Sequence, residues 1–128
     1  MTAASIAGLL EESAANRPGH ALLRDTAGAT LTVAEVWNLT AAATHWLADA
    51  GIRPGMTVAW QLPSHVPAAV LMLALARSPV TQAPILHIGR QREVCAAVDV
   101  ADADILVVDG STAANAPQGA RIATMPDD

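Results

Sequence analysis

The chain has 128 residues, a length that favours one domain with a buried core of its own. Its net charge of −5 and its complete lack of Lys argue against a nucleic-acid-binding surface. The single cysteine, Cys95, excludes an internal disulfide and a multi-cysteine zinc site, and the absence of Phe and Tyr predicts a core of Ala, Val, Leu, Ile and Met.

The first predicted elements are a helix and a hairpin. Apolar residues within 6–10 recur at helical spacing, and Pro18 marks the end of that helix. The runs 21–25 and 30–33 flank the turn sequence TAGA, and together they predict a β-hairpin.

A second helix follows the hairpin directly. Thr32 precedes Glu35 by three positions, which is the spacing of a capping box at a helix N-terminus. The helix is expected to stop at Gly51, with Pro54 beyond it. Its predicted apolar face consists of Val36, Leu39, Ala43, Trp46 and Leu47.

Beyond residue 56 the pattern alternates between strands and helices. Strands are predicted at 57–62, 80–86 and 104–110, and helices at 66–77 and 89–103. Short, nearly apolar strands occur where helices cover both faces of a sheet, and this alternation predicts parallel pairing. The expected fold class is α/β: a partial doubly wound, mostly parallel sheet with flanking helices, preceded by a short hairpin.

The remaining residues, 111–128, are rich in Ser, Thr, Ala, Asn, Pro and Gly and show no clear pattern. They predict a linker or disordered tail. The α/β domain is therefore expected to span residues 1–110.

The apolar block at 58–80 does not predict a membrane span. Its helical part is closed by Arg77 and has about half of the roughly 20 residues that a spanning helix needs. The N-terminus has no basic residue before its apolar patch, unlike a signal peptide. We expect a cytoplasmic protein without a membrane span.

Motifs for phosphate binding and metal coordination are absent, so no catalytic, cofactor-binding or metal-ligating residue is predicted. His65 and His87 each follow a predicted parallel strand, where ligands of open α/β sheets bind. Together with Ser64 they are the candidates for ligand-side loop residues; the alternative is that they are solvated loop residues. Ser64 is also a candidate cap for the helix at 66–77. Four acidic residues are interpreted as a solvated face: Asp99, Asp102, Asp104 and Asp109.

Four segments stand in an order that a known family shares. They are LTVAEV (31–36), GIRPGMTV (51–58), AWQLPSHVPAAVLMLALA (59–76) and APILHIGRQREV (83–94). Over about residues 6–110 the chain resembles the N-terminal region of the adenylate-forming (AMP-binding) acyl-CoA synthetases, and VAWQLP is most similar to fatty-acid or carboxylate–CoA ligases. Met56 and Ser64 stand where that family usually has Asp and Asn.

The resemblance implies a role in a larger enzyme. A complete family enzyme joins a carboxylate to AMP from ATP and then transfers the acyl group to CoA, so ATP, Mg and CoA are implied for it and none for this chain. The family's phosphate loop and its catalytic Lys lie downstream of the matching region. We therefore expect an N-terminal fragment or truncated paralogue that acts as a structural scaffold and is inactive alone. The alternatives are a non-catalytic binding or dimerisation module derived from the family and an unrelated flavodoxin-like ligand domain.

Two kinds of protein partner are expected. One is the remainder of a longer parent enzyme. The other is a second copy of the chain, because apolar surface and an unpaired strand edge favour self-association. The region predicted for this homodimer is 58–62 with 105–108, or a helix face beside it; the alternative is a stable monomer.

Overall fold

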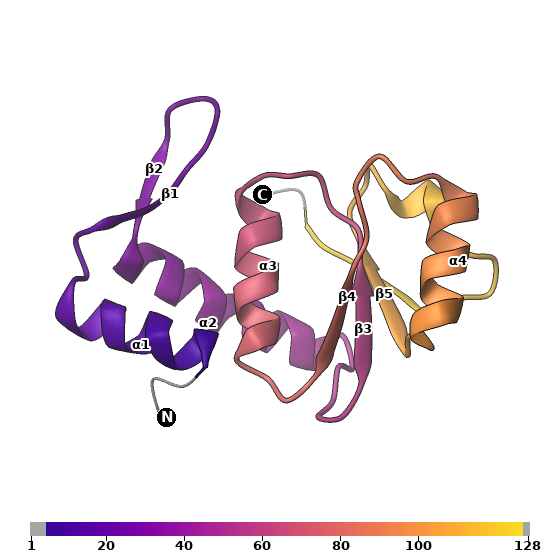
Figure 1. Cartoon of the computed structure of the whole chain (residues 1–128), viewed down its shortest axis with the longest axis horizontal. Helices are drawn as coiled ribbons and strands as arrows, with labels where there is room; N and C mark the ends of the chain where they lie inside the picture. The colour runs from indigo at the N-terminus through magenta and orange to yellow at the C-terminus, as the bar shows by residue number, and fades with distance from the viewer. Residues whose placement is uncertain (1–4, 127–128) are drawn as a thin grey trace.

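The computed structural model describes residues 5–126, in which helices flank a parallel sheet and a hairpin projects to one side (Figure 1). The first elements are α1 (Ile6–Asn16), β1 (Ala21–Arg24), β2 (Thr30–Thr32) and α2 (Val33–Asp49). β1 and β2 pair antiparallel as the predicted hairpin. Residues 1–4 of the predicted domain and 127–128 of the predicted tail lie outside the described range.

A four-stranded sheet forms the centre of the fold. Its strands and their connections are β3 (Thr57–Trp60), α3 (Val66–Ala76), β4 (Thr81–Pro84), α4 (Gln91–Ala101), β5 (Ile105–Val108), the 3-10 helix η1 (Ala113–Asn115) and β6 (Ile122–Thr124). The strand order is β4-β3-β5-β6, and every neighbouring pair is parallel. The predicted α/β class, with its parallel sheet, flanking helices and hairpin, is confirmed.

Side chains of β3 and β5 alternate between the two faces of the sheet. Val58 and Val107 pack with residues of α2 and α3 on one face. Ala59 and Leu106 pack with Val94 of α4 on the other. Because both faces are covered, all four strand residues are buried, which is why these strands appear in the sequence as continuous apolar runs.

Polar contacts at two places along α2 fix this helix. At its start, the Thr32 hydroxyl accepts a hydrogen bond from the Glu35 N–H at 3.2 Å, and the Glu35 carboxylate accepts one from the Thr32 N–H at 2.9 Å, so the predicted capping box is confirmed. Farther along, Arg77 at the end of α3 lies 3.9 Å from the ring centroid of Trp37 and donates to the Thr40 hydroxyl at 3.0 Å. The charge that closes the apolar run therefore ties α3 to α2.

The apolar segment around α3 is a short, packed helix. α3 has 11 residues, and Leu71 and Leu75 within it are fully buried. In the described part of the chain, no helix is both long enough and apolar enough to cross a membrane.

β6 corrects the prediction of an unstructured stretch after residue 110. Residues 122–124 pair with β5, and residues 113–115 form η1. β6 has only three residues, and Ile122 is exposed. The local sequence gives little indication of such a strand, because its extended structure depends on pairing with β5 rather than on its own β-propensity.

The position of β6 bears on the strand edges expected at the region predicted for a homodimer. β3 and β5 are the two inner strands of the sheet, and residues 58–62 and 105–108 are buried. The edges belong to β4 and β6. Neither predicted segment therefore presents a free strand edge to a second copy.

Candidate functional site

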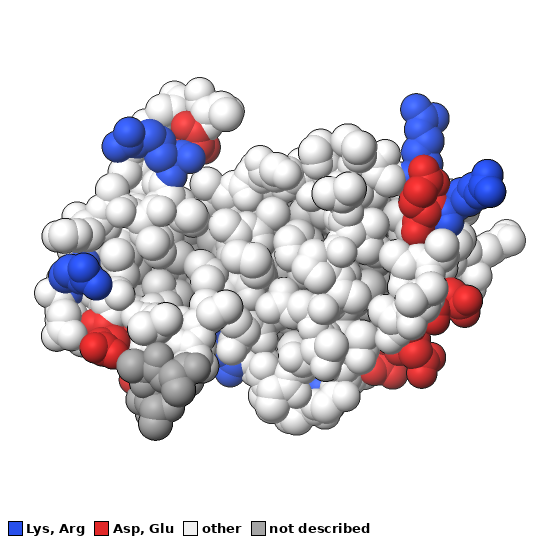
Figure 2. All heavy atoms as spheres, viewed as in Figure 1, with Lys and Arg blue, Asp and Glu red and all other residues white. Residues whose placement is uncertain are grey.

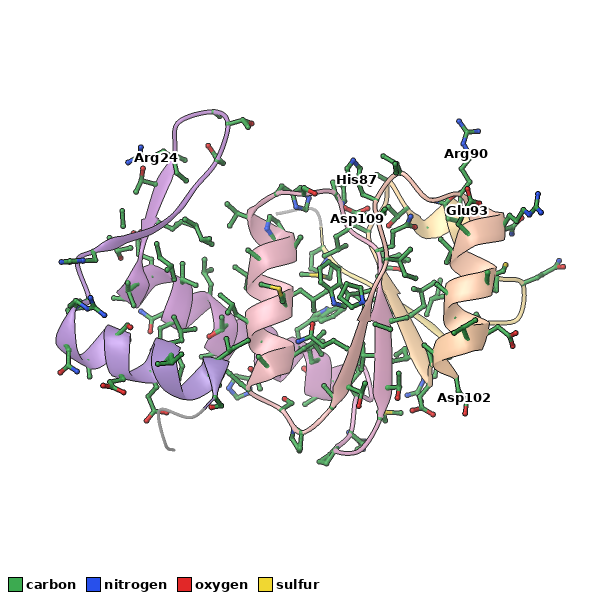
Figure 3. The ribbon with its side chains drawn as sticks, viewed as in Figure 1. Arg24, His87, Arg90, Glu93, Asp102 and Asp109 are labelled. Atoms are coloured by element: carbon green, nitrogen blue, oxygen red, sulfur yellow. The ribbon has the colours of Figure 1, made fainter. Side chains whose placement is uncertain are left out.

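Three loops meet at the carboxyl edge of the sheet. They follow β3, β4 and β5, which are parallel, so their carboxyl ends lie at the same edge. Figure 3 shows His87 and Asp109 at this edge and Asp102 at the opposite one.

The buried side chain of Gln61 joins these loops. Its Nε2 donates to the carbonyl of Leu86 at 2.9 Å and to that of Gly89 at 2.7 Å, both in the β4–α4 loop. Its Oε1 accepts a hydrogen bond from Nδ2 of Asn115 in η1 at 3.2 Å. Both polar atoms of a fully buried amide are thus paired, as burial away from water requires.

Thr112 connects the loop after β5 to the end of β3. Its buried hydroxyl donates to the Gln61 carbonyl at 2.8 Å and accepts from the Asp109 N–H at 3.1 Å. The Gln61 N–H in turn donates to the Val107 carbonyl at 2.9 Å. Main chain and side chain of Gln61 therefore hold all three loops in one network.

The carboxylate of Asp109 folds back onto its own loop. Its Oδ1 accepts hydrogen bonds from the Ser111 hydroxyl at 2.6 Å, the Ser111 N–H at 2.8 Å and the Thr112 N–H at 3.2 Å. Partial burial raises the pKa of Asp109, but the hydrogen bonds from Ser111 and Thr112 together outweigh it and hold this pKa below its ordinary value of 3.8. The side chain is only 13% exposed, so Asp109 departs from the predicted solvated face.

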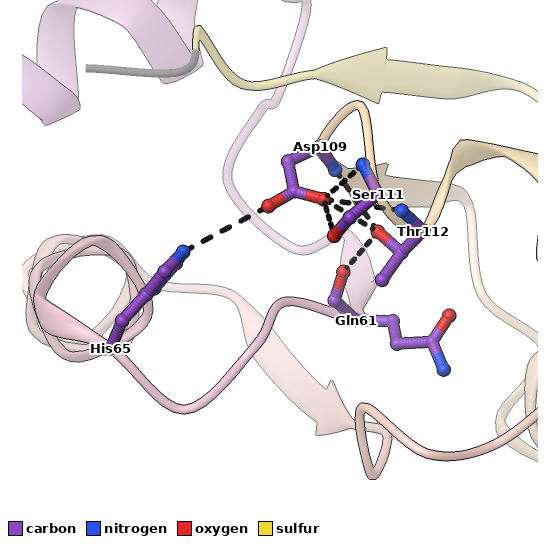
Figure 4. Close-up of polar contacts among 5 residues, drawn as sticks. All are labelled: Gln61, His65, Asp109, Ser111 and Thr112. Atoms are coloured by element: carbon purple, nitrogen blue, oxygen red, sulfur yellow. Dashed lines mark hydrogen bonds and ion pairs between the residues drawn. The ribbon is translucent and has the colours of Figure 1, made fainter.

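His65 faces Asp109 across a small cleft (Figure 4). Its Nε2 lies 3.9 Å from Oδ2 of Asp109, the carboxylate oxygen that Ser111 and Thr112 do not use. The cleft has a volume of about 270 Å³, and its other lining residues are Leu62, Pro63, Pro67, Ser111, Met125 and Pro126. It therefore combines one polar pair with mostly apolar walls.

The other two predicted site residues do not join this pair. His87 is exposed on the β4–α4 loop, and within residues 5–126 no hydrogen bond or ion pair engages its ring. Ser64 is exposed beside His65, but it does not cap α3. The N-cap is His65, whose side chain makes no capping bond, and Pro67 in the first turn has no N–H to offer.

The chemistry open to the His65–Asp109 pair is limited by its neighbours. The Ser111 hydroxyl donates to Asp109 and not to His65, so these three residues do not form a nucleophile–base relay. Within the described residues, no group of three or more His, Cys, Asp or Glu side chains could hold a metal ion. An imidazole nitrogen and a carboxylate oxygen can instead hydrogen-bond a hydroxyl or an amine.

The residues that organise this edge were not predicted from the sequence: Gln61, Thr112 and Asn115. The one available signal was a lone amide inside the apolar run VAWQLP, because a buried amide must find partners. Those partners lie 25 to 54 positions away along the chain, so no local pattern identifies them.

Comparison with known proteins identifies the class. The family model described as AMP-binding enzyme matches residues 10–127, and the chain belongs to this family. This confirms the resemblance that the four sequence segments indicated.

The relatives are much longer than the chain. Oxalate–CoA ligase of Arabidopsis thaliana is 35% identical over 86 residues, which are 66% of this chain and 17% of the ligase. The N-terminal subdomain of Klebsiella oxytoca NpsA, in complex with 3-hydroxyanthranilyl-AMSN, matches with a TM-score of 0.86 and 17% identity, over 97% of this chain and 33% of that one. VinN matches with a TM-score of 0.83 and 20% identity, over 94% and 31%. The structural matches establish a shared fold, and the chain spans a third of those proteins or less.

Replacing Gln61 by Leu should lower the free energy of unfolding by about 3 kcal/mol, because the Leu86 and Gly89 carbonyls lose their buried partner. Urea denaturation monitored by circular dichroism measures the change. The same replacement at the exposed Gln118 is the control and should alter stability by less than about 0.5 kcal/mol. Equal effects at the two positions would contradict the role assigned to Gln61.

Asp109 should make stability sensitive to acid. Its pKa is lowered by folding, so the ionised carboxylate stabilises the native state above 3.8, and this contribution is lost as the pH falls through and below that value. The stability difference between the wild type and Asp109→Asn, followed by urea denaturation from neutral to acidic pH, should therefore shrink on acidification. Asp99→Asn, at an exposed carboxylate, is the control and should show a smaller dependence. A difference for Asp109→Asn that stays constant with pH would refute the assignment.

Proposed function

We propose that this chain is the N-terminal scaffold of an acid–thiol ligase of the acyl-CoA synthetase type. The observation that carries the proposal is the 35% identity to an oxalate–CoA ligase over 86 residues. This similarity lies in sequence, and it favours a CoA ligase as the parent.

The proposed role is structural. The chain has no Lys, so it cannot supply the lysine that typically contacts nucleotide phosphates in phosphate-binding loops. What it does provide is a carboxyl edge whose loops are held in place by Gln61 and Thr112. In the proposed parent enzyme, such an edge is a rigid surface on which segments carrying the chemistry are positioned.

A second candidate is the corresponding part of an adenylation domain that serves a carrier protein. The fold match to NpsA favours it, since one NpsA structure is described as an artificially fused adenylation–PCP di-domain. The two candidates share acid adenylation and differ in the thiol that accepts the acyl group.

The experiment compares the 128-residue chain with the protein isolated from its native source by antibody capture. ATP–pyrophosphate exchange with a panel of carboxylic acids, oxalate included, should stay at background for the purified chain. The native protein should have an intact mass well above 13.1 kDa and should catalyse the exchange. Exchange by the chain alone would overturn the scaffold role, and a native mass of 13.1 kDa would overturn the larger parent. Thiol-dependent turnover with CoA or with a carrier protein separates the two candidates.

A further inference from the structure

The carboxylate of Asp109 has no strongly basic partner in the described part of the chain. Its side chain is only 13% exposed, yet within residues 5–126 no Arg forms an ion pair with it. Asp side chains that are largely removed from water usually have a partner of opposite charge. The negative charge of Asp109 is therefore free to pair with a cation that these residues do not supply.

The two oxygens of this carboxylate have different surroundings. Oδ1 accepts the hydrogen bonds that Ser111 and Thr112 donate. Oδ2 accepts none of them and faces His65 across the cleft (Figure 4). Partial burial raises the pKa of Asp109, but the bonds to Oδ1 outweigh it and hold this pKa below its ordinary value, so the carboxylate is ionised at neutral pH. The loop thus presents one anionic oxygen to the cleft in a fixed position.

His65 supplies a second acceptor opposite this oxygen. Its Nε2 lies 3.9 Å from Oδ2 of Asp109, too far for a direct hydrogen bond. One donor nitrogen can lie about 2.9 Å from both atoms, because their separation is less than twice that distance. A neutral imidazole accepts through one ring nitrogen, and an ammonium group has three N–H donors. The gap between the two side chains therefore fits a single ammonium group.

The rest of the cleft favours a cation with an apolar stem. The cleft has a volume of about 270 Å³, and its described lining contains no Arg and is mostly apolar, with Leu62, Pro63 and Met125 among the walls. The Arg side chains visible in Figure 2 lie mainly around α1 and the hairpin and around α4, whereas Figure 3 shows Asp109 between these regions. An anion would meet the Asp109 carboxylate there without an Arg to hold it.

Other donors fit the pair less well. A hydroxyl group has one proton and cannot donate to both acceptors. A guanidinium group pairs best with both oxygens of a carboxylate, but Oδ1 of Asp109 already accepts hydrogen bonds from Ser111 and Thr112. A metal ion would find two side-chain ligands, and within the described residues no group of three or more is present.

We propose that the cleft between His65 and Asp109 binds an alkylammonium group. The nitrogen lies between Nε2 of His65 and Oδ2 of Asp109, and the alkyl part lies against the apolar walls. Two sources share this chemistry: a free primary amine and a lysine side chain of a longer polypeptide, since the chain itself has no Lys. The proposal does not rest on the proposed function, because it concerns a site formed by described residues of this chain.

Titration of the ¹⁵N-labelled chain with n-butylammonium chloride, followed by NMR at pH 7.5 and constant ionic strength, tests the proposal. At this pH alkylamines are protonated and histidine side chains are ordinarily neutral. The N–H signals of Ser111 and Thr112, which donate to Asp109, should shift and saturate. Methylammonium should bind about tenfold more weakly, because it lacks three CH₂ groups that contact the walls. Sodium butyrate and n-butanol should also bind at least about tenfold more weakly, since neither carries the positive charge.

Variants assign the binding to the two side chains. Asp109→Asn should raise the dissociation constant of butylammonium about tenfold or more, because it removes the charge. His65→Leu should raise it about fivefold, because it removes one acceptor. The matched control is Asp99→Asn at an exposed carboxylate on α4, which should bind butylammonium like the wild type. Circular dichroism verifies that each variant is folded.

Shifts at Ser111 and Thr112 that do not saturate, or that butyrate or butanol reproduces at the same concentration, would overturn the proposal. Equal effects of Asp109→Asn and Asp99→Asn would overturn it as well. If Asp109→Asn does not fold, the ligand series on the wild type and the His65→Leu variant still decide the outcome.

Carbodiimide cross-linking of the protein isolated from its native source separates the two sources of the ammonium group. An amide between Asp109 and a lysine of the same polypeptide would identify an internal side chain, whereas its absence, with butylammonium bound by the chain, would identify a free amine. A native mass of 13.1 kDa would overturn the larger parent enzyme but not this site.

Discussion

The two amide protons of Gln61 are directed at the carbonyls of Leu86 and Gly89, and this pairing underlies the carboxyl edge of the sheet. An unpaired amide at a fully buried position would cost several kcal/mol. The main chain of the β4–α4 loop supplies the acceptors, so folding of that loop and burial of Gln61 depend on each other. Gly89 fits the same constraint: a Cβ there would lie 3.2 Å from the Leu86 oxygen and 3.5 Å from Nε2 of Gln61.

Buried polar groups are fully paired in this molecule, but its surface keeps several large apolar side chains. Every buried side-chain nitrogen or oxygen within residues 5–126 has a hydrogen-bond partner. Large apolar side chains stay exposed around α1 and the hairpin, as at Ile6 and Leu9, and also on the sheet half, as at Leu86, Ile88 and Val100. A two-stranded hairpin is marginally stable unless it packs against another element, and here it stands beside an open groove. The polar interior is therefore complete, whereas apolar surface remains open in both halves.

Local patterns predicted the elements but not the contacts between distant ones. The capping box of Thr32 and Glu35 places the start of α2, since both partners lie within one turn. Apolar runs predict β3 and β5, because strands covered on both faces lose the alternation of polar and apolar residues. β6 was missed, since it becomes a strand only by pairing with β5. That omission made β5 look like an edge strand, although it is an inner strand of the sheet.

The candidate site was predicted only in part for the same reason. His65 was expected at the carboxyl edge from the order of elements alone. Its partner Asp109 was interpreted as one of several solvated acids, although its carboxylate bonds Ser111 only two positions on, a local turn contact that Asp commonly makes and that the sequence DGST was compatible with. Ser64 was expected to cap α3, but the helix has its N-cap one residue later. Side-chain roles at a sheet edge thus depend on which loops meet there, which sequence spacing does not specify.

The most direct test of the Gln61 network is hydrogen exchange of side-chain amides, followed by NMR on ¹⁵N-labelled protein. Gln61 is buried and both of its Nε2 protons are donated to main-chain carbonyls, so they should exchange far more slowly than those of the exposed Gln118 in the same sample. Exchange of the Gln61 amide at the rate of Gln118 would show that the three loops are not held together by this side chain.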